Sequence, residues 1–251
     1  MRVISIINLK GGVAKSITSI NMAYCLSQDS KVLLIDNDKQ GNSTKFYGQH
    51  SYDRKSLSEI LLGTADIHDV IRHTDHENLD IVPANMSLLK ANRDVLLETT
   101  RPQQMRIKEA LVHVESEYDY CIIDNAPDIN ISVVNALVAT DDVIIPVKID
   151  AFTFDGIAEI MEQMQDIRKY YNPKLNFSGC LVTSYRNNEV NNEGVQLLKH
   201  RYGKVFNTKI RWTKKVDEST FECVPIMDYS SRCGAAKDYI SFTNEYKGGL
   251  Q

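Results

Sequence analysis

Short runs rich in Val and Ile alternate along the chain with stretches in which apolar residues recur every three or four positions. The continuous runs are typical of strands buried on both faces of a sheet, and the periodic stretches are typical of helices with one buried face. The runs predict strands at Val3–Ile7, Val32–Ile35, Leu79–Pro83, Tyr120–Asp124, Val143–Val147 and Phe177–Thr183. The periodic stretches predict helices at Ser16–Leu26, Ser87–Leu97, Ile107–Val114, Val133–Ala139 and Ile157–Tyr170.

This alternation predicts a doubly wound α/β domain with a mostly parallel sheet, because each crossover lays a helix across the sheet. The 251 residues, 43% of them hydrophobic, suffice for one sizeable core, and no repeat or Pro/Gly/Ser-rich linker marks a boundary. We expect a single domain over residues 1–251, with a loose tail at about 247–251. Ligands of such sheets bind at the carboxyl ends of strands, where this sequence reads INLKGG, LIDND and IIDNAP.

The cysteines and the hydropathy of the chain indicate in which cellular compartment the protein is found. The chain has five widely spaced cysteines, mostly in apolar surroundings and without a C-x-x-C pair: Cys25, Cys121, Cys180, Cys223 and Cys233. This pattern favours reduced, buried thiols over a disulfide framework or a zinc site. No apolar stretch approaches the roughly 18 residues that span a bilayer, and the N-terminus lacks a signal-peptide pattern. We therefore expect a cytoplasmic protein.

The formal net charge of −4 argues by itself against a nucleic-acid partner, but the charge is unevenly distributed. Ile167–Lys215 holds eleven Lys or Arg against two acidic residues, an excess of +9. Such a basic segment favours contact with DNA phosphates, and a merely solvated surface is the alternative. The candidate DNA-binding residues are Arg186, Lys199, Arg201, Lys204, Arg211, Lys214 and Lys215.

A glycine-containing loop, Lys10-Gly11-Gly12-Val13-Ala14-Lys15-Ser16, separates the first predicted strand from the first predicted helix. Glycines let successive backbone N–H groups point at an anion, and the helix N-terminus adds partial positive charge. We expect Lys15 to reach the β- and γ-phosphates of a nucleotide and the Ser16 hydroxyl to bind Mg²⁺. A turn without a ligand is the alternative for the loop alone. The expected nucleotide contacts are Gly11, Gly12, Val13, Ala14, Lys15, Ser16 and Ile17.

Two further stretches place carboxylates at the ends of predicted strands. VLLIDNDKQGNST, residues 32–44, carries Asp36 and Asp38, and YDYCIIDNAP, residues 118–127, carries Asp124. A lone Asp at a strand end is commonly a cap or turn residue. Because all three motifs occur along the chain in this order, we favour one shared site for phosphate and metal.

Together these motifs resemble those of the ParA/Soj-type partitioning ATPases of the ParA/MinD superfamily, whose deviant Walker A motif is K-G-G-x-x-K-[ST]. The stretch at 32–44 resembles the second motif of that family, D-x-D-P-Q-G-N, and the stretch at 118–127 resembles its D-x-x-P segment. Val133–Ile157 and Val224–Tyr239 also resemble ParA segments, so most of the chain is covered.

The chain departs from the family pattern at Ala14, where glycine is usual, at Lys39, where proline is usual, and at Asn125-Ala126. If position 14 requires a positive φ, the Ala14 Cβ costs about 1 kcal/mol or more. That cost would weaken nucleotide binding severalfold.

The resemblance implies a slow, partner-stimulated ATPase that uses ATP and Mg²⁺. It implies that Lys10 reaches the nucleotide of a partner subunit and that Asp38 orients the attacking water, beside Lys15. Asp124 would hold the metal through water, and Asp36 would support the metal network that Ser16 contacts directly. ATP binding would then drive homodimer formation, and hydrolysis would release the dimer.

The resemblance also implies nonspecific binding of double-stranded DNA by the ATP dimer, a DNA-bound adaptor resembling ParB, and an association with the bacterial nucleoid. Plasmid partition and chromosome segregation both fit. The sequence begins directly at its first predicted strand, from which we expect no helix-turn-helix extension ahead of it.

Two alternative functions share the same nucleotide site. A MinD-like membrane switch needs a basic amphipathic terminal helix, whereas Ala235–Tyr246 has no basic excess and its pattern indicates core packing, so we expect no membrane partner. The other alternative is a scaffold that binds ATP and barely hydrolyses it. Iron–sulfur relatives of the superfamily need positioned cysteines that the five present do not suggest.

Overall fold

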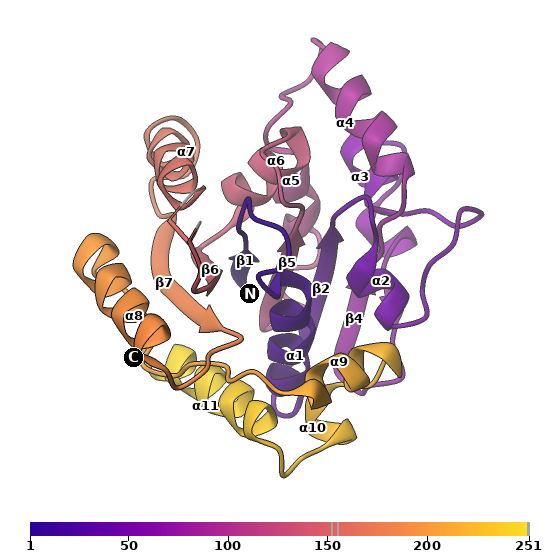
Figure 1. The fold of residues 1–251 in the computed structure, drawn as a ribbon. Coiled ribbons are helices and arrows are strands. Elements are labelled where there is room, and N and C mark those ends of the chain that lie inside the picture. Colours follow the sequence, from indigo (N-terminus) through magenta and orange to yellow (C-terminus); the bar gives the residue numbers. More distant parts are fainter. Residues whose placement is uncertain (152, 155, 250–251) are drawn as a thin grey trace.

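A parallel sheet forms the centre of the molecule (Figure 1). The computed structural model describes residues 1–151, 153–154 and 156–249. Within them the strand order is β3-β4-β2-β5-β1-β6-β7, and all neighbours pair in parallel except β3 with β4. The strands are β1 (Arg2–Ile6), β2 (Val32–Asn37), β3 (Arg72–His73), β4 (Leu79–Val82), β5 (Tyr120–Asn125), β6 (Asp142–Lys148) and β7 (Asn176–Thr183). The predicted doubly wound, mostly parallel α/β fold is confirmed.

Helices connect these strands. They are α1 (Lys15–Ser27), α2 (Asn42–Phe46), α3 (Leu57–Leu62), the 3-10 helix η1 (Ile67–Asp69), α4 (Ser87–Leu97), α5 (Arg106–Val112), α6 (Ile131–Ala139), α7 (Ile157–Tyr170), α8 (Glu189–Tyr202), α9 (Lys214–Phe221), α10 (Ile226–Tyr229) and α11 (Gly234–Gly248). The six predicted strands are all present with ends within two residues of the prediction, and α4 and α7 match their predicted bounds. The periodicity did not reveal β3, α2, α3, α8, α9 or α10.

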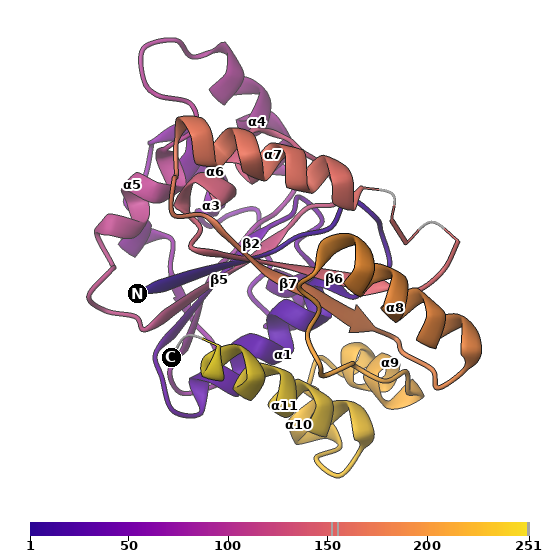
Figure 2. The same cartoon turned by 90° about the vertical axis from the view of Figure 1, so that its left-hand side faces the viewer.

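The two faces of the sheet are covered by different helices (Figure 2). On one face α1 and α11 pack over the central strands, with Leu34 in the same apolar cluster as Phe242 of α11. On the other face α3, α4, α5 and α6 lie over the cluster that contains Leu33 and Ile35, and α7 continues this layer toward β7. Leu34 lies in one cluster and its neighbours Leu33 and Ile35 in the other, because successive side chains of a strand point to opposite faces of the sheet.

One buried carboxylate joins the beginning of the chain to its last helix. Asp142 is 1% exposed and accepts hydrogen bonds from Arg2 Nε at 2.8 Å and the Tyr246 hydroxyl at 2.7 Å. Asn176 and Ser178 of β7 each donate another at 2.8 Å. Burial acts to raise the pKa of Asp142, but these hydrogen bonds hold it below its usual value. This carboxylate therefore links β1, β6, β7 and α11.

The structure corrects two expectations. Cys121 and Cys180 are buried, but Cys223 is exposed, so the expectation of buried thiols fails there. The helix α11 continues through Gly248, so residues 247 and 248 of the expected tail are helical, and Lys247 pairs with Asp29 at 2.7 Å. Residues 250–251 of that tail, and residues 152 and 155 of the ParA-like segment 133–157, lie outside the described residues.

The expected packing of the terminal helix is largely confirmed. Ala236, Tyr239, Phe242 and Tyr246 are buried, whereas Ile240 is 45% exposed. No helix in the described ranges is both long and apolar enough to cross a membrane.

Candidate nucleotide-binding site

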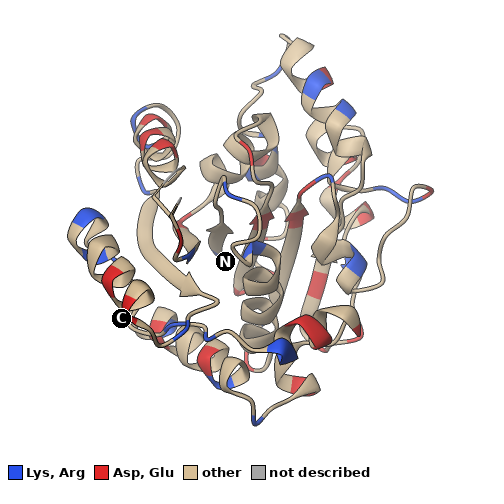
Figure 3. Cartoon of the chain, in the orientation of Figure 1, with Lys and Arg blue, Asp and Glu red and all other residues tan. Residues whose placement is uncertain are grey.

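The carboxyl ends of the central strands bring two of the predicted acidic residues together. The parallel register pairs Asp36 of β2 with Asp124 of β5, and Asp124 with Ile6 at the end of β1. Both carboxylates have 0% exposure. Figure 3 shows acidic positions at the tips of these two strands, beside the loop that leaves β1. The sheet thus places the three sequence motifs at one edge.

The loop after β1 curls around a lysine. Lys15 is 8% exposed, and its Nζ donates to the carbonyl of Lys10 at 3.0 Å. Gly12 has φ +72°, and a Cβ added at Gly11 or Gly12 would meet nothing within 4 Å. The loop is therefore open at both glycines, next to the start of α1, and a helix N-terminus of this kind fits an anion.

The charge of Lys15 is opposed by burial and supported by nearby carboxylates. Burial lowers the pKa of the Lys15 ammonium, and the negative charges of Asp124, Asp38 and Asp128 counteract this effect. The lysine is therefore already held within a group of acidic side chains at the start of α1.

The two buried carboxylates are held by hydroxyl groups. Asp124 accepts from Ser43 Oγ at 2.6 Å and from Ser19 Oγ at 3.2 Å. Burial raises the pKa of Asp124, while these two hydroxyls and that of Ser16 lower it. Asp36 accepts from the backbone N–H and hydroxyl of Thr44 at 2.8 and 2.7 Å. These serine and threonine partners were not predicted.

The charges of Asp36 and Asp124 bear on whether a cation fits here. Burial, followed by the neighbouring charge of Asp124, raises the pKa of Asp36 to about 7. Two adjacent buried carboxylates near the Ser16 hydroxyl form an all-oxygen donor set, which fits Mg²⁺ with phosphate and water as further ligands. No cluster of three or more His, Cys, Asp or Glu that could hold a metal by itself occurs in the described part of the chain.

Asp38 begins the turn between β2 and α2. It is 7% exposed, and its Oδ1 accepts from the Gln40 N–H at 2.9 Å, while its own N–H donates to Asp36 at 3.1 Å. Gly41 in the same turn has φ +63°, and a Cβ there would come within 2.8 Å of the Ala84 carbonyl. The turn therefore holds Asp38 next to Asp36 and requires glycine three residues later.

Lys10 points toward β6, whereas Asp36 and Asp124 lie at the ends of β2 and β5, on the other side of β1. Its ammonium forms an ion pair with Asp150, which follows β6. Its N–H donates to Asn8 Oδ1 at 2.9 Å, and Asn8 Nδ2 donates to the Pro146 carbonyl at 2.7 Å. The loop is thus fastened to the end of β6, and Lys10 is held by its own chain.

Two departures from the family pattern have structural explanations. Asn125 is 1% exposed, accepts from Asn37 Nδ2 at 2.9 Å and donates to the Ile6 carbonyl at 3.3 Å. It therefore joins the ends of β1, β2 and β5, one residue beyond Asp124. Lys39 lies 3.8 Å from Asp128, so it connects the loops that follow β2 and β5.

The remaining predicted contacts lie at the start of α1 and beside it. Ile17 packs partly against the core, and the Val13 carbonyl accepts from Thr183 Oγ1 at 3.1 Å. A small pocket next to Ala14 includes Trp212, which is 50% exposed.

The basic candidates separate into two groups. Lys199, Arg201 and Lys204, at the end of α8 and just beyond it, are exposed and form no ion pair among the described residues. The second group lies near α9 and is largely paired with acidic residues. Its members are Arg211 with Asp238 at 2.7 Å, Lys215 with Glu218 at 2.7 Å and Lys214 with Glu218 at 3.9 Å.

Arg186 belongs to neither group of basic residues. It is exposed just after the end of β7, and its guanidinium stacks 4.4 Å from the Trp212 ring centroid. Its charge is therefore held over an aromatic face, where a cation is favoured.

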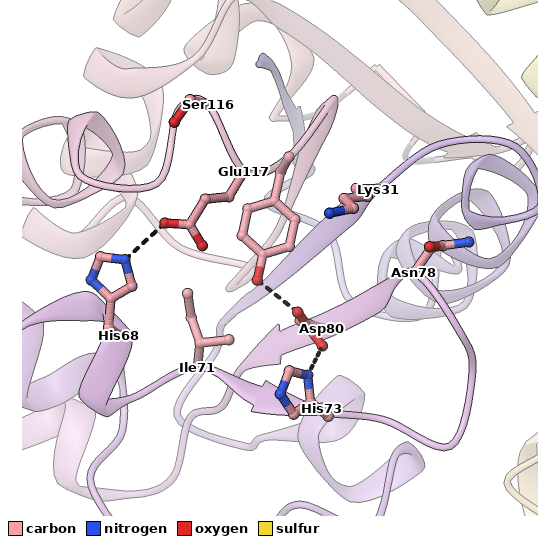
Figure 4. A pocket seen from close by; sticks show the side chains of 9 residues that line it. Lys31, His68, Ile71, His73, Asn78, Asp80, Ser116 and Glu117 are labelled. Atoms are coloured by element: carbon pink, nitrogen blue, oxygen red, sulfur yellow. Dashed lines mark hydrogen bonds and ion pairs between the residues drawn. The ribbon is translucent and has the colours of Figure 1, made fainter.

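A cavity of about 660 Å³ lies at the amino ends of β2, β4 and β5, away from these motifs (Figure 4). Its histidine and acidic side chains already have partners: His68 contacts Glu117 at 2.9 Å, and Asp80 contacts His73 and Tyr118, each at 2.7 Å. None of the predicted site residues lines it. The loop edge of the sheet is therefore the better candidate site.

The parallel sheet, the loop around Lys15 and the paired carboxylates define a P-loop nucleotide-binding protein of the deviant Walker A type. The family described as "AAA domain" matches residues 1–177. The chain is 34% identical to the sporulation initiation inhibitor protein Soj of Bacillus subtilis, over 97% of both chains. It is 30% identical to the chromosome partitioning protein ParA of Caulobacter vibrioides, over 98% of this chain and 93% of that one.

A solved structure is also similar to this chain in fold and sequence. Cobyrinic acid a,c-diamide synthase from Mycobacterium smegmatis, with bound ATP analog and magnesium, matches with a TM-score of 0.86 and 28% identity, covering 97% of this chain and 93% of that one. The chain belongs to the ParA/Soj-type family of partitioning ATPases. The resemblance stated from the three motifs is thereby confirmed.

Replacing Ala14 with glycine is expected to stabilise the protein. Ala14 has φ 63° and ψ 35°, a left-handed conformation that costs an L-residue about 1–2 kcal/mol. Glycine removes this strain but adds about 0.4–1 kcal/mol of unfolded-state entropy. The net gain of about 0.5–1 kcal/mol should raise the Tm by about 1–4 °C, measured by calorimetry without nucleotide.

Gly12 offers a matched control for this variant. It also has a positive φ, +72°, and a Cβ added there would meet open space, so Gly12→Ala should lower the Tm through backbone strain alone. If Ala14→Gly lowered the Tm as well, the backbone at position 14 would not be strained.

Proposed function

We propose that this protein is an ATP-dependent DNA-partitioning ATPase that dimerises on ATP binding, binds DNA nonspecifically and is released on hydrolysis. The observation that carries the proposal is Lys15, buried at the start of α1 between the Lys10 carbonyl and the acidic strand ends. The names of the Soj and ParA relatives support partitioning as the process. Its place of action would be the bacterial cytoplasm, on the nucleoid.

ATP would lie with its phosphates against the N–H groups of residues 11–17. Lys15 would neutralise the β- and γ-phosphates, and the Ser16 hydroxyl would hold Mg²⁺ directly. Asp124 would hold the metal through water, and Asp36 would support this network. The metal would supply positive charge that neutralises the phosphates. The ATP analog and magnesium in the similar solved structure support both ligands.

Hydrolysis would require two further residues. Asp38, fixed by the Gln40 N–H and adjacent to Asp36, would orient the attacking water in line with the terminal phosphate. Lys10 would leave its ion pair with Asp150 and reach the nucleotide of a second subunit. Each site would then be complete only in a dimer, so ATP would act as the dimerising ligand and turnover would be slow.

DNA binding would rest mainly on the basic residues at the end of α8. Arg211 forms an ion pair with Asp238, and Lys214 and Lys215 both pair with Glu218. Lys199, Arg201 and Lys204 have no such acidic partner in the described chain and remain exposed, with Arg186 as a further candidate. Dimerisation would double these phosphate contacts, which couples DNA affinity to ATP.

A triple variant tests this division of the basic residues. Lys199→Ala/Arg201→Ala/Lys204→Ala should weaken binding to random duplex DNA about tenfold or more. Because the dimer loses six cations, the dependence of log affinity on log salt should flatten by about five units. The measurement is fluorescence anisotropy with ATP and Mg²⁺ at several salt concentrations. The control Lys214→Ala/Lys215→Ala should change the slope by less than about one unit. A larger effect of the control would move the DNA surface to α9.

The proposed cycle is tested by analytical ultracentrifugation with ADP, with ATP and Mg²⁺, and without nucleotide. We expect dimers only in the sample with ATP and Mg²⁺. An unchanged sedimentation coefficient in all three samples would refute the cycle. Phosphate release with DNA and a ParB-like adaptor present distinguishes an ATPase from a nucleotide-binding scaffold. Flotation with liposomes distinguishes it from a membrane switch.

A further inference from the structure

Lys39 and Asp128 form a charge pair at the mouth of the proposed nucleotide site. Lys39 follows Asp38 directly in the loop between β2 and α2, and Asp128 lies in the loop between β5 and α6. Their closest N–O distance is 3.8 Å, and their side chains are 34% and 45% exposed. The pair is therefore a partly solvated contact, which is worth little by itself and is easily exchanged.

Asp128 is a shared neighbour of two lysines. Its negative charge acts on Lys15, where it counteracts the lowering of the pKa by burial, and its carboxylate lies 3.8 Å from the Lys39 ammonium. Asp128 also accepts from Asn130 Nδ2 at 2.6 Å, and Asn130 Oδ1 accepts from the N–H of Val133 in the first turn of α6. The carboxylate thus connects the two lysines to the start of a helix.

We propose that Lys39 is a specificity-determining residue that leaves Asp128 for the terminal phosphate of a nucleoside triphosphate, and so favours ATP over ADP. The inference rests on the proposed function, since it places the phosphates between Lys15 and the loop that carries Asp38. A terminal phosphate has more charge and more acceptor oxygens than one carboxylate, so it competes successfully for an exposed ammonium. ADP lacks this group and leaves Lys39 with Asp128.

Exchange of the pair also has a consequence for the loops. Once Lys39 contacts phosphate, Asp128 loses this partner, and one contact between the loop before α6 and the loop after β2 is lost. The hydrogen bond from the Ala126 N–H to the Asn37 carbonyl, at 3.3 Å, still joins the two segments. Lys39 acts here through charge, which a neutral side chain of similar length does not supply.

Calorimetry with ADP and with a non-hydrolysable ATP analog, both with Mg²⁺, tests the inference. Lys39→Gln should weaken binding of the analog about threefold to tenfold and leave ADP affinity unchanged, whereas Lys39→Arg should retain the wild-type ratio. Lys45→Gln is the control, because Lys45 is an exposed lysine on α2 that donates to the Gln40 carbonyl and contacts no acidic residue in the described structure. It should leave both affinities within about twofold.

The outcomes separate the two proposals. If wild-type protein binds both nucleotides and Lys39→Gln weakens them equally, or changes neither, Lys39 is not a determinant of specificity and the proposed function stands. If wild-type protein binds no adenine nucleotide, the proposed function fails and this inference fails with it. Thermal unfolding of each variant checks that the fold is retained.

Discussion

Replacement of Lys15 by alanine is expected to abolish ATP binding, with a loss of affinity of at least about 100-fold. Lys15 is buried at the start of α1, and its ammonium is the cation on which the charges of Asp124 and Asp38 act. Without this ammonium, the triphosphate would meet these buried carboxylates directly. A 100-fold loss corresponds to about 2.7 kcal/mol, a plausible amount for a desolvated charge–phosphate contact.

Isothermal calorimetry with Mg²⁺ and ATP measures this loss. Because removal of a buried charge also disturbs its neighbours, the thermal unfolding of the variant should be compared with that of Lys15→Met, which keeps the length of the side chain. Lys31→Ala, at the other edge of the sheet, is the control and should bind as the wild type does. A Lys15→Ala protein with ATP affinity within threefold of wild type would show that the loop is not the nucleotide site.

Asp38→Asn is expected to reduce ATP turnover by about 100-fold while ATP affinity changes less than about threefold. The amide oxygen keeps the hydrogen bond from the Gln40 N–H, so the turn should remain intact. It carries no charge to polarise and orient the attacking water, a role of the kind that contributes about 10²–10⁴-fold in rate. The ATP-bound dimer should therefore persist instead of dissociating.

Single-turnover phosphate release and sedimentation in the presence of ATP measure these two effects. Asp53→Asn serves as a control, since Asp53 is an exposed residue of the loop that follows α2. Turnover by Asp38→Asn at the wild-type rate would contradict the assignment of Asp38, and a short-lived dimer would contradict the link between hydrolysis and release.

The strands could be predicted because each is a nearly continuous apolar run buried on both faces. The helix α8 could not, since its buried residues are few and it contains Gly194 and two Asn. It begins at an Asn188 cap, and its Val195 and Leu198 are buried against the sheet edge. Its stability thus depends on tertiary packing, which periodicity does not show. The two-residue strand β3 is too short to leave a pattern.

The order of the site motifs was evident in the sequence, but their geometry was not. The pairing of Asp36 with Asp124 depends on the register of β2 against β5, which are far apart in the chain. Ser43 and Thr44 stand inside the second motif and could have been suspected as hydroxyl partners, and Ser19 lies one turn after Ser16 on the same face of α1. These supporting contacts become clear only once the strands are aligned.

The basic segment illustrates a further limit. A count of charges over residues 167–215 cannot separate exposed cations from paired ones, because the acidic partners of Arg211 and Lys215 lie beyond that segment. Asp238 belongs to α11, whereas Glu218 is a near neighbour on α9. The structure reduces the excess of charge that is available to a polyanion and concentrates it near the end of α8.

The contacts of the Asp142 carboxylate determine when this protein can complete its fold during synthesis. It binds both Arg2 and Tyr246, and Ile4 and Ile6 of the first strand share an apolar cluster with Phe242. Because a ribosome makes Arg2 first and Tyr246 last, the part of this face that α11 covers stays exposed until translation is almost complete. The nascent chain therefore exposes the apolar strand residues that α11 later buries.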